Sequence, residues 1–258
     1  MFVGAVEGPA RLVIAGLAAV VAGAVNSIAG GGTLLTFPTL IALGVNPVMA
    51  NATNTLALFP GSFAAAIGFR RELGRTAHWL RLLLPPSLVG GAAGAVLLLH
   101  TSPSLFRAIS PFLVLLAAGL LALQDRYGAR LVRVGGTPST GWRVGVLGFQ
   151  FLVGVYGGFF GAGIGILMLA ALGAIGVGTI HEMNGLKNVL AASINVLAAI
   201  YFAVSGAIVW SLAVVMAVGA IAGGFAGATV SRRFPAHLVS RAVVVIGVGV
   251  AIGLFVTR

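Results

Sequence analysis

The stretch Asn184-Gly185-Leu186-Lys187-Asn188, with Asn195 two helical turns later, opens a long apolar segment. Its lysine is the only one in a chain of 258 residues. On a helix, Asn184, Lys187, Asn188 and Asn195 fall within an arc of about 100°. An ionisable residue inside a membrane costs about 2.5–3.5 kcal/mol on insertion scales. We therefore expect this polar stripe to face a cavity, a partner helix or a ligand.

The composition predicts a membrane protein. Hydrophobic residues make up 59% of the chain and charged residues 7%, and the mean hydropathy is +1.13, whereas soluble domains carry about 25% charged residues. The net charge of +11 comes from arginines that cluster between apolar runs, which is typical of loops beside anionic lipids and does not require nucleic acid. The absence of cysteine excludes disulfides and thiol catalysis.

The chain divides into apolar segments, two of which are too short to cross a bilayer unaided. A span needs about 20 residues, and segments 33–44 and 164–178 are shorter than that. Each follows a glycine cluster, which favours a broken helix or a re-entrant hairpin, so the number of full spans stays open. The ten segments are 11–28, 33–44, 52–69, 80–99, 105–124, 143–160, 164–178, 186–206, 208–230 and 239–256.

An internal repeat relates the two halves of the chain. A shift of 131 residues superposes Gly30 on Gly161 and Gly32 on Gly163, and a shift of 133 superposes the run 90–95 on 223–228. The second shift also gives the opening stripe a counterpart in the first half. The matched positions are Asn184 with Asn51, Lys187 with Asn54, Asn188 with Thr55 and Asn195 with Ser62.

The distribution of basic residues predicts the orientation. If the segments alternate and the N-terminus is outside, 12 of the 15 basic residues lie on the inner side, as the positive-inside rule requires. Five segments per half is an odd number, so the second half enters the membrane from the opposite side. We therefore expect an all-α polytopic fold of two inverted-topology repeats, residues 1–125 and 143–258, joined by a cytoplasmic linker, 126–142, with both termini outside.

The polar residues favour a site for a small oxyanion. Half-helix N-termini carry unpaired N–H groups that suit anions, and Gly30, Gly31, Gly32, Gly161 and Gly163 are the candidate hinges and backbone donors. Several uncharged hydrogen-bonding groups and one cation would offset the desolvation of the anion. The candidate binding residues are Asn26, Thr33, Asn51, Asn54, Thr55, Ser62, Asn184, Lys187, Asn188 and Asn195.

Each of these features also has a structural alternative. Glycines at GxxxG spacing, such as Gly154 and Gly158, serve helix packing in many membrane proteins, and asparagines hydrogen-bond between helices. Lys187 could extend to the inner interface. His181 and Glu182 are candidates for proton coupling, or they belong to an interfacial loop.

Three motifs resemble the sulfite exporter TauE/SafE family of bacterial and archaeal permeases. They are the runs 26–32 (NSIAGGG), 50–54 (ANATN) and 184–188 (NGLKN), and the resemblance extends over nearly the whole chain. It implies a multi-pass cell-membrane protein that moves a sulfur-containing anion, such as sulfite, sulfoacetate or another organosulfonate, usually outward.

The expected function is therefore a secondary transporter that exports a small sulfur-containing anion by alternating access. The open alternatives are a passive anion channel and a permease for a different solute or a metal ion. We expect no enzymatic activity, because the chain has four acidic residues and shows no paired carboxylates for acid–base work. No cofactor, resident metal or nucleic acid is expected. Proton coupling and a homodimer are further hypotheses.

Overall fold

The computed structural model describes residues 8–28, 31–68, 73–127, 140–230 and 236–256. Over these residues the chain is helical and contains no strand, which confirms the predicted all-α class. All ten predicted segments are helices, and a short 3₁₀ helix, η1 (Gly74–Thr76), precedes α5. The helices are α1 (Pro9–Ile28), α2 (Thr33–Ala42), α3 (Pro47–Gly68), α5 (Ala77–His100), α6 (Pro103–Tyr127), α7 (Thr140–Phe159), α8 (Ile164–Ala174), α9 (Ile180–Val204), α10 (Trp210–Val230) and α11 (Ala236–Val256).

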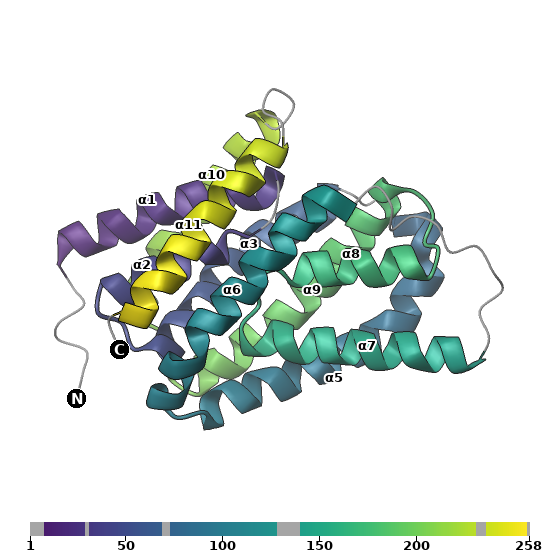
Figure 1. The fold of residues 1–258 in the computed structure, drawn as a ribbon, viewed down its shortest axis with the longest axis horizontal. Coiled ribbons are helices and arrows are strands. Elements are labelled where there is room, and N and C mark those ends of the chain that lie inside the picture. The colour runs from purple at the N-terminus through teal and green to yellow at the C-terminus, as the bar shows by residue number, and fades with distance from the viewer. Residues whose placement is uncertain (1–7, 29–30, 69–72, 128–139, 231–235, 257–258) are drawn as a thin grey trace.

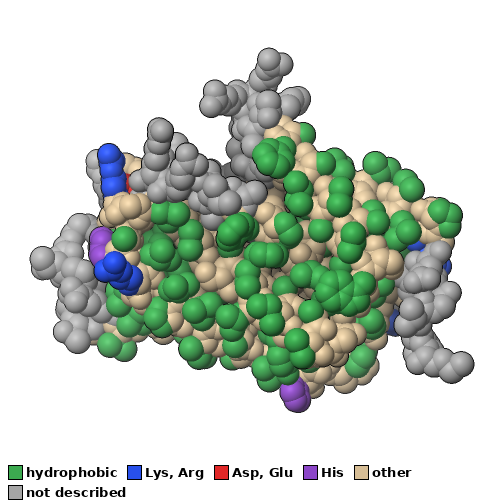
Figure 2. Space-filling model, turned by 180° about the vertical axis from the view of Figure 1, so that it is seen from behind, with side chains coloured by type: hydrophobic (Ala, Val, Ile, Leu, Met, Phe, Trp, Pro, Cys, Tyr) green, Lys and Arg blue, Asp and Glu red, His purple; other side chains and the backbone are tan. Residues whose placement is uncertain are grey.

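The two short segments are short helices, as predicted. α2 has 10 residues and α8 has 11, so neither can cross a hydrocarbon core of about 30 Å by itself. Among the described residues, five helical stretches are long and apolar enough to span a membrane. Figure 2 shows hydrophobic side chains spread over one face of the molecule, with Lys, Arg and His side chains near its rim in that view. The protein is a multi-pass membrane protein.

Two helices begin earlier than the hydrophobic pattern predicts. α3 starts at Pro47 rather than residue 52, and α9 starts at Ile180 rather than residue 186. Asn46 accepts a hydrogen bond from the Val48 N–H at 3.0 Å, and proline is favoured in the first helical turn. These added first turns extend the helices beyond the predicted segments, so Asn51 lies inside regular helix and Lys187 lies two turns from the start of α9.

The helices pack in pairs that join distant parts of the chain. α1 packs along α10, and α5 packs along α7. α1 and α10 run parallel, because Gly219, Gly223 and Gly227 contact Gly16, Val20 and Ala24 in the same order. A Cβ atom on Gly223 would overlap the carbonyl oxygen of Val20. Only glycine permits so close an approach of two backbones.

The α5–α7 pair repeats this arrangement. A Cβ atom on Gly90 would overlap the carbonyl oxygen of Phe151, and one on Gly94 would overlap that of Val155. α6 and α11 form a third pair that runs antiparallel: Phe112 contacts Phe255 with ring centroids 5.1 Å apart, and Ala118 lies against Gly247. α3 and α9 pack against each other at the centre of the molecule.

Candidate substrate site

The α3 stripe consists of Asn51, Asn54, Thr55 and Ser62, and its described side chains are buried. Asn54 Nδ2 donates to Thr33 Oγ1 at 3.3 Å, and Thr36 Oγ1 donates to Asn54 Oδ1. Thr55 Oγ1 donates to the Asn51 carbonyl oxygen, one turn back, at 3.0 Å. The two bonds of Asn54 join the first turn of α2 to α3. The Ser62 side chain lies outside the described residues.

Asn51 extends from α3 to the end of α7. Its side chain is fully buried, and Nδ2 donates to the carbonyl oxygen of Phe159 at 2.9 Å. Asn51 Oδ1 has no hydrogen-bond partner among the described residues. The atom of this amide that lacks any partner is thus an acceptor, and an anion offers acceptors rather than donors.

The α9 stripe consists of Asn184, Lys187, Asn188 and Asn195, and all four side chains are half-buried. Lys187 Nζ donates to Asn184 Oδ1 at 2.9 Å. Within the described ranges, no carboxylate pairs with Lys187 and no hydrogen bond is made by the amides of Asn188 or Asn195. The stripe therefore has one cation without a counter-charge and two amides with unused donors.

The Lys187 side chain lies against the first turn of α8. A Cβ atom on Gly165 would be 3.2 Å from Lys187 Cδ, so glycine leaves room for the aliphatic chain. The N-cap residue of α8 is Gly163, which has φ +76° and supplies no side-chain hydrogen bond. Unpaired N–H groups at a helix N-terminus carry a partial positive charge. The lysine and this helix end together make an electropositive corner.

The corresponding corner of the first half is filled by protein groups. Gly31 has φ +90° and turns the chain between α1 and α2. The Gly32 N–H donates to Asn26 Oδ1 at 2.7 Å, so a side chain of α1 caps α2. Asn54, which matches Lys187 under the 133-residue shift, is already bonded to Thr33 and Thr36. The predicted hinge Gly30 lies outside the described residues.

The second glycine cluster has two separate roles. Gly161 and Gly163 have φ of +78° and +76° and break the chain between α7 and α8, as predicted, while the Tyr156 hydroxyl donates to the Ala162 carbonyl oxygen at 2.8 Å. Gly154 and Gly158 instead contact the α5 backbone at Ser87 and Gly91. Their GxxxG spacing serves helix packing.

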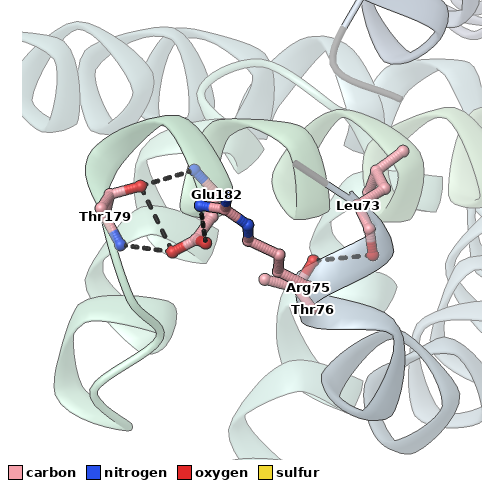
Figure 3. Close-up of polar contacts among 5 residues, drawn as sticks. All are labelled: Leu73, Arg75, Thr76, Thr179 and Glu182. Carbon is pink, nitrogen blue, oxygen red and sulfur yellow. Dashed lines mark hydrogen bonds and ion pairs between the residues drawn. The ribbon is translucent and has the colours of Figure 1, made fainter. Parts of the chain in front are cut away.

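Glu182 has a structural role that the sequence analysis missed. Its carboxylate accepts the Thr179 N–H at 2.8 Å, and the Glu182 N–H donates to Thr179 Oγ1 at 3.3 Å, which together form a capping box at the start of α9 (Figure 3). The Thr179-x-x-Glu182 spacing is a known signal for this motif. Glu182 also lies 3.9 Å from the guanidinium of Arg75. The His181 side chain lies outside the described residues.

Another polar pair lies between α5 and α7. Gln150 is fully buried, and its Nε2 donates to Ser87 Oγ at 2.8 Å, while Oε1 has no described partner. The 131-residue shift matches Gln150 with Ala19, and the 133-residue shift matches Ser87 with Ala220. Both alanines are also buried. This polar contact is therefore specific to one of the two helix pairs.

Comparisons with known proteins identify the family of this chain. The profile of the family described as "Sulfite exporter TauE/SafE" matches residues 15–254. The chain belongs to this family. It is therefore a membrane transporter of the TauE/SafE type, and the family points to a permease rather than an enzyme.

Curated relatives are described as probable membrane transporters. The chain is 32% identical to "Probable membrane transporter protein YfcA" of Escherichia coli K12 over 81% of its own length and 76% of the relative's. It is 32% identical to a "Probable membrane transporter protein" of Haemophilus influenzae, over 81% and 80% of the two chains. A third relative, from a Sinorhizobium species, is 30% identical over 92% and 90%. No solved structure matches the chain.

Proposed function

We propose that this TauE/SafE transporter is a secondary exporter of a small sulfur-containing anion, such as sulfite, sulfoacetate or another organosulfonate. The observation that carries the proposal is Lys187, a half-buried cation whose described partner is the neutral amide of Asn184. A buried charge needs a counter-charge. A bound anion would supply it, and the family description supports sulfite as the first candidate.

The α9 stripe forms the principal wall of the proposed site. Lys187 supplies the charge, and Asn188 and Asn195 supply amide donors that have no described partner. The N-terminus of α8 lies alongside the lysine. In this proposal the α3 stripe holds the opposite wall in place, because each of its described side chains donates a hydrogen bond to a protein oxygen.

The proposal includes two inverted repeats, residues 1–125 and 143–258, with both termini outside and proton coupling through His181 or Glu182. Helix packing supports the duplication: the shifts of 131 and 133 residues convert the Val20–Gly223 contact into the Phe151–Gly90 contact. The antiparallel course of α6 and α11, which match under the second shift, supports the inversion.

A thermal-shift screen of the purified protein in nanodiscs tests the function. A ligand that binds the native state raises the apparent stability by mass action. We expect sulfite or an organosulfonate to raise the melting temperature, and Lys187→Met to abolish the shift. Arg107→Met, which removes an exposed arginine, is the control and should keep the shift. Equal shifts in both variants, or stabilisation by carboxylates alone, would contradict the proposal.

A further inference from the structure

The strongest contacts between helices do not follow the division into repeats. α1 precedes the linker and α10 follows it, yet a Cβ atom on Gly223 would overlap the Val20 carbonyl oxygen. α5 and α7 also lie on opposite sides of the linker and have the same backbone contact at Gly90 and Gly94. Closely packed backbones cannot slide past each other without a large cost, since protein interiors resist small changes in volume.

The remaining contacts extend each pair into a larger unit. α3 packs against α10, and α2 packs against both α1 and α3. Likewise α9 packs against α5, and α8 packs against both α7 and α9. We define body 1 as α1, α2, α3 and α10, and body 2 as α5, α7, α8 and α9. In Figure 1, α1, α2 and α10 are on the left, α7 and α8 are on the right, and α3 and α9 lie between them.

Polar contacts strengthen each body from within. In body 1, Asn54 bonds to Thr33 and Thr36 across α2 and α3, and Thr53 Oγ1 accepts the Val209 N–H at the start of α10 at 3.0 Å. In body 2, Gln150 bonds to Ser87 across α5 and α7. Each body is thus held by backbone packing and by hydrogen bonds.

At the boundary between the bodies, the described polar and aromatic contacts are made by side chains. α3 packs against α9 there, and Asn51 Nδ2 donates to the Phe159 carbonyl oxygen. The ring of Phe37 on α2 meets that of Phe160, just after α7, with centroids 5.3 Å apart. Asn51 Oδ1 has no described partner, so this amide loses a single hydrogen bond if the bodies separate. The proposed site also lies at this boundary, because the α9 stripe belongs to body 2 and the α3 stripe to body 1.

We propose that the moving parts of this transporter are body 1 and body 2, each built from helices of both repeats, and that the repeats themselves do not move as units. This inference rests on the proposed alternating-access function. α5 belongs to the first repeat but moves with body 2, and α10 belongs to the second repeat but moves with body 1. The α6–α11 pair contacts both bodies, through α2 and α3 on one side and α8 on the other.

Distance measurements between spin labels test the inference. The chain contains no cysteine, so pairs of cysteines can be introduced at lipid-exposed positions of the full protein in nanodiscs. Leu17, Val89, Leu152 and Val218 are exposed on α1, α5, α7 and α10. The pairs Leu17/Val218 and Val89/Leu152 lie within one body but in different repeats. Leu17/Val89 and Leu152/Val218 lie within one repeat but in different bodies.

Pulsed electron paramagnetic resonance is recorded with and without sulfite, and with Asn51→Leu, which removes the hydrogen bond between the bodies. We expect the two within-body distances to stay constant and the two within-repeat distances to shift under at least one perturbation. Phe37→Leu, which reduces the aromatic contact at the same boundary, is the second perturbation if Asn51→Leu does not fold.

The reverse result, fixed within-repeat distances and shifted within-body distances, would overturn the inference. So would four constant distances under every perturbation. The failure of the proposed function has a different signature: sulfite then changes neither the distances nor the melting temperature, while Asn51→Leu or Phe37→Leu still shifts the within-repeat distances. In that case the inference about the two bodies is retained, and the transported solute is not sulfite.

Discussion

Asn51 Nδ2 lies 2.9 Å from the carbonyl oxygen of Phe159, and this hydrogen bond joins α3 to the last residue of α7. The matching residue of the second half, Asn184, instead accepts a hydrogen bond from the ammonium group of Lys187 through Oδ1. Two asparagines that match under the 133-residue shift thus have different roles. One holds two helices together, and the other orients a cation.

The first prediction concerns this hydrogen bond. Asn51→Leu leaves the Phe159 carbonyl oxygen without its donor, and hydrogen bonds between membrane helices contribute about 0.6 kcal/mol on average and up to about 1.7. We expect a loss of about 1 kcal/mol in unfolding free energy, measured by titration with denaturing detergent. Thr55→Val removes a bond that stays within α3 and should be nearly neutral. Equal losses in the two variants would show that the contact with α7 contributes nothing.

The second prediction separates the two stripes. Asn188→Ala removes an amide that has no described partner, so stability should be kept while sulfite binding weakens by about 10- to 100-fold, as expected for a hydrogen bond to a charged group. Asn54→Ala removes the bonds to Thr33 and Thr36, so its main effect should be on stability. Calorimetric titration and thermal unfolding measure the two effects. Loss of stability in Asn188→Ala with unchanged binding would invert the assignment.

The third prediction concerns the matched glycines. Gly90→Ala and Gly223→Ala place a methyl group against a backbone carbonyl, and overpacking costs about 1–3 kcal/mol. We expect both variants to be destabilised by similar amounts, because their surroundings match. Gly249, on α11, has open space around it, so Gly249→Ala should be neutral or slightly stabilising. A large difference between Gly90→Ala and Gly223→Ala would argue against equivalent interfaces.

The fourth prediction concerns the turn before α8. A Cβ atom on Gly163 would meet Ala117 at 3.5 Å, an ordinary contact, so its substitution tests backbone conformation alone. Because φ is +76°, Gly163→Ala should cost about 1–2 kcal/mol. Gly163→Asn should cost less, since asparagine tolerates the left-handed region better. Equal melting temperatures of the alanine variant and the wild type would rule out this turn geometry.

The fifth prediction concerns Glu182. Glutamine also forms a capping box, so Glu182→Gln should keep the stability of α9 while Glu182→Ala should lose about 1 kcal/mol. The ion pair adds little, because the Arg75 side chain is 83% exposed and exposed pairs contribute weakly. Flux driven by a proton gradient is the second measurement. If Glu182→Gln retains that flux, His181 is left as the candidate for proton coupling.

The sequence by itself determined the membrane environment, the ten helices and the positions of the breaks. These follow from local chemistry: apolar runs require lipid, and glycine clusters permit the left-handed turns at Gly31, Gly161 and Gly163. The sequence also contains signals for the starts of α3 and α9, namely Asn46-Pro47 and Thr179-x-x-Glu182. The hydrophobic pattern missed the start of α9 because its first turn contains His181 and Glu182, and it missed the start of α3 because Asn51 interrupts the apolar run there.

Only the tertiary structure decided how the polar stripes are used and which helices belong together. Asn54 and Lys187 occupy matching positions. The Asn54 amide hydrogen-bonds to two threonine hydroxyl groups of α2, whereas the aliphatic chain of Lys187 packs against a glycine of α8. The pairing of α1 with α10 and of α5 with α7 depends on backbone surfaces brought together from opposite halves of the chain. Spacing along a sequence gives the face of a helix, whereas the partner of that face depends on the packing of the whole molecule.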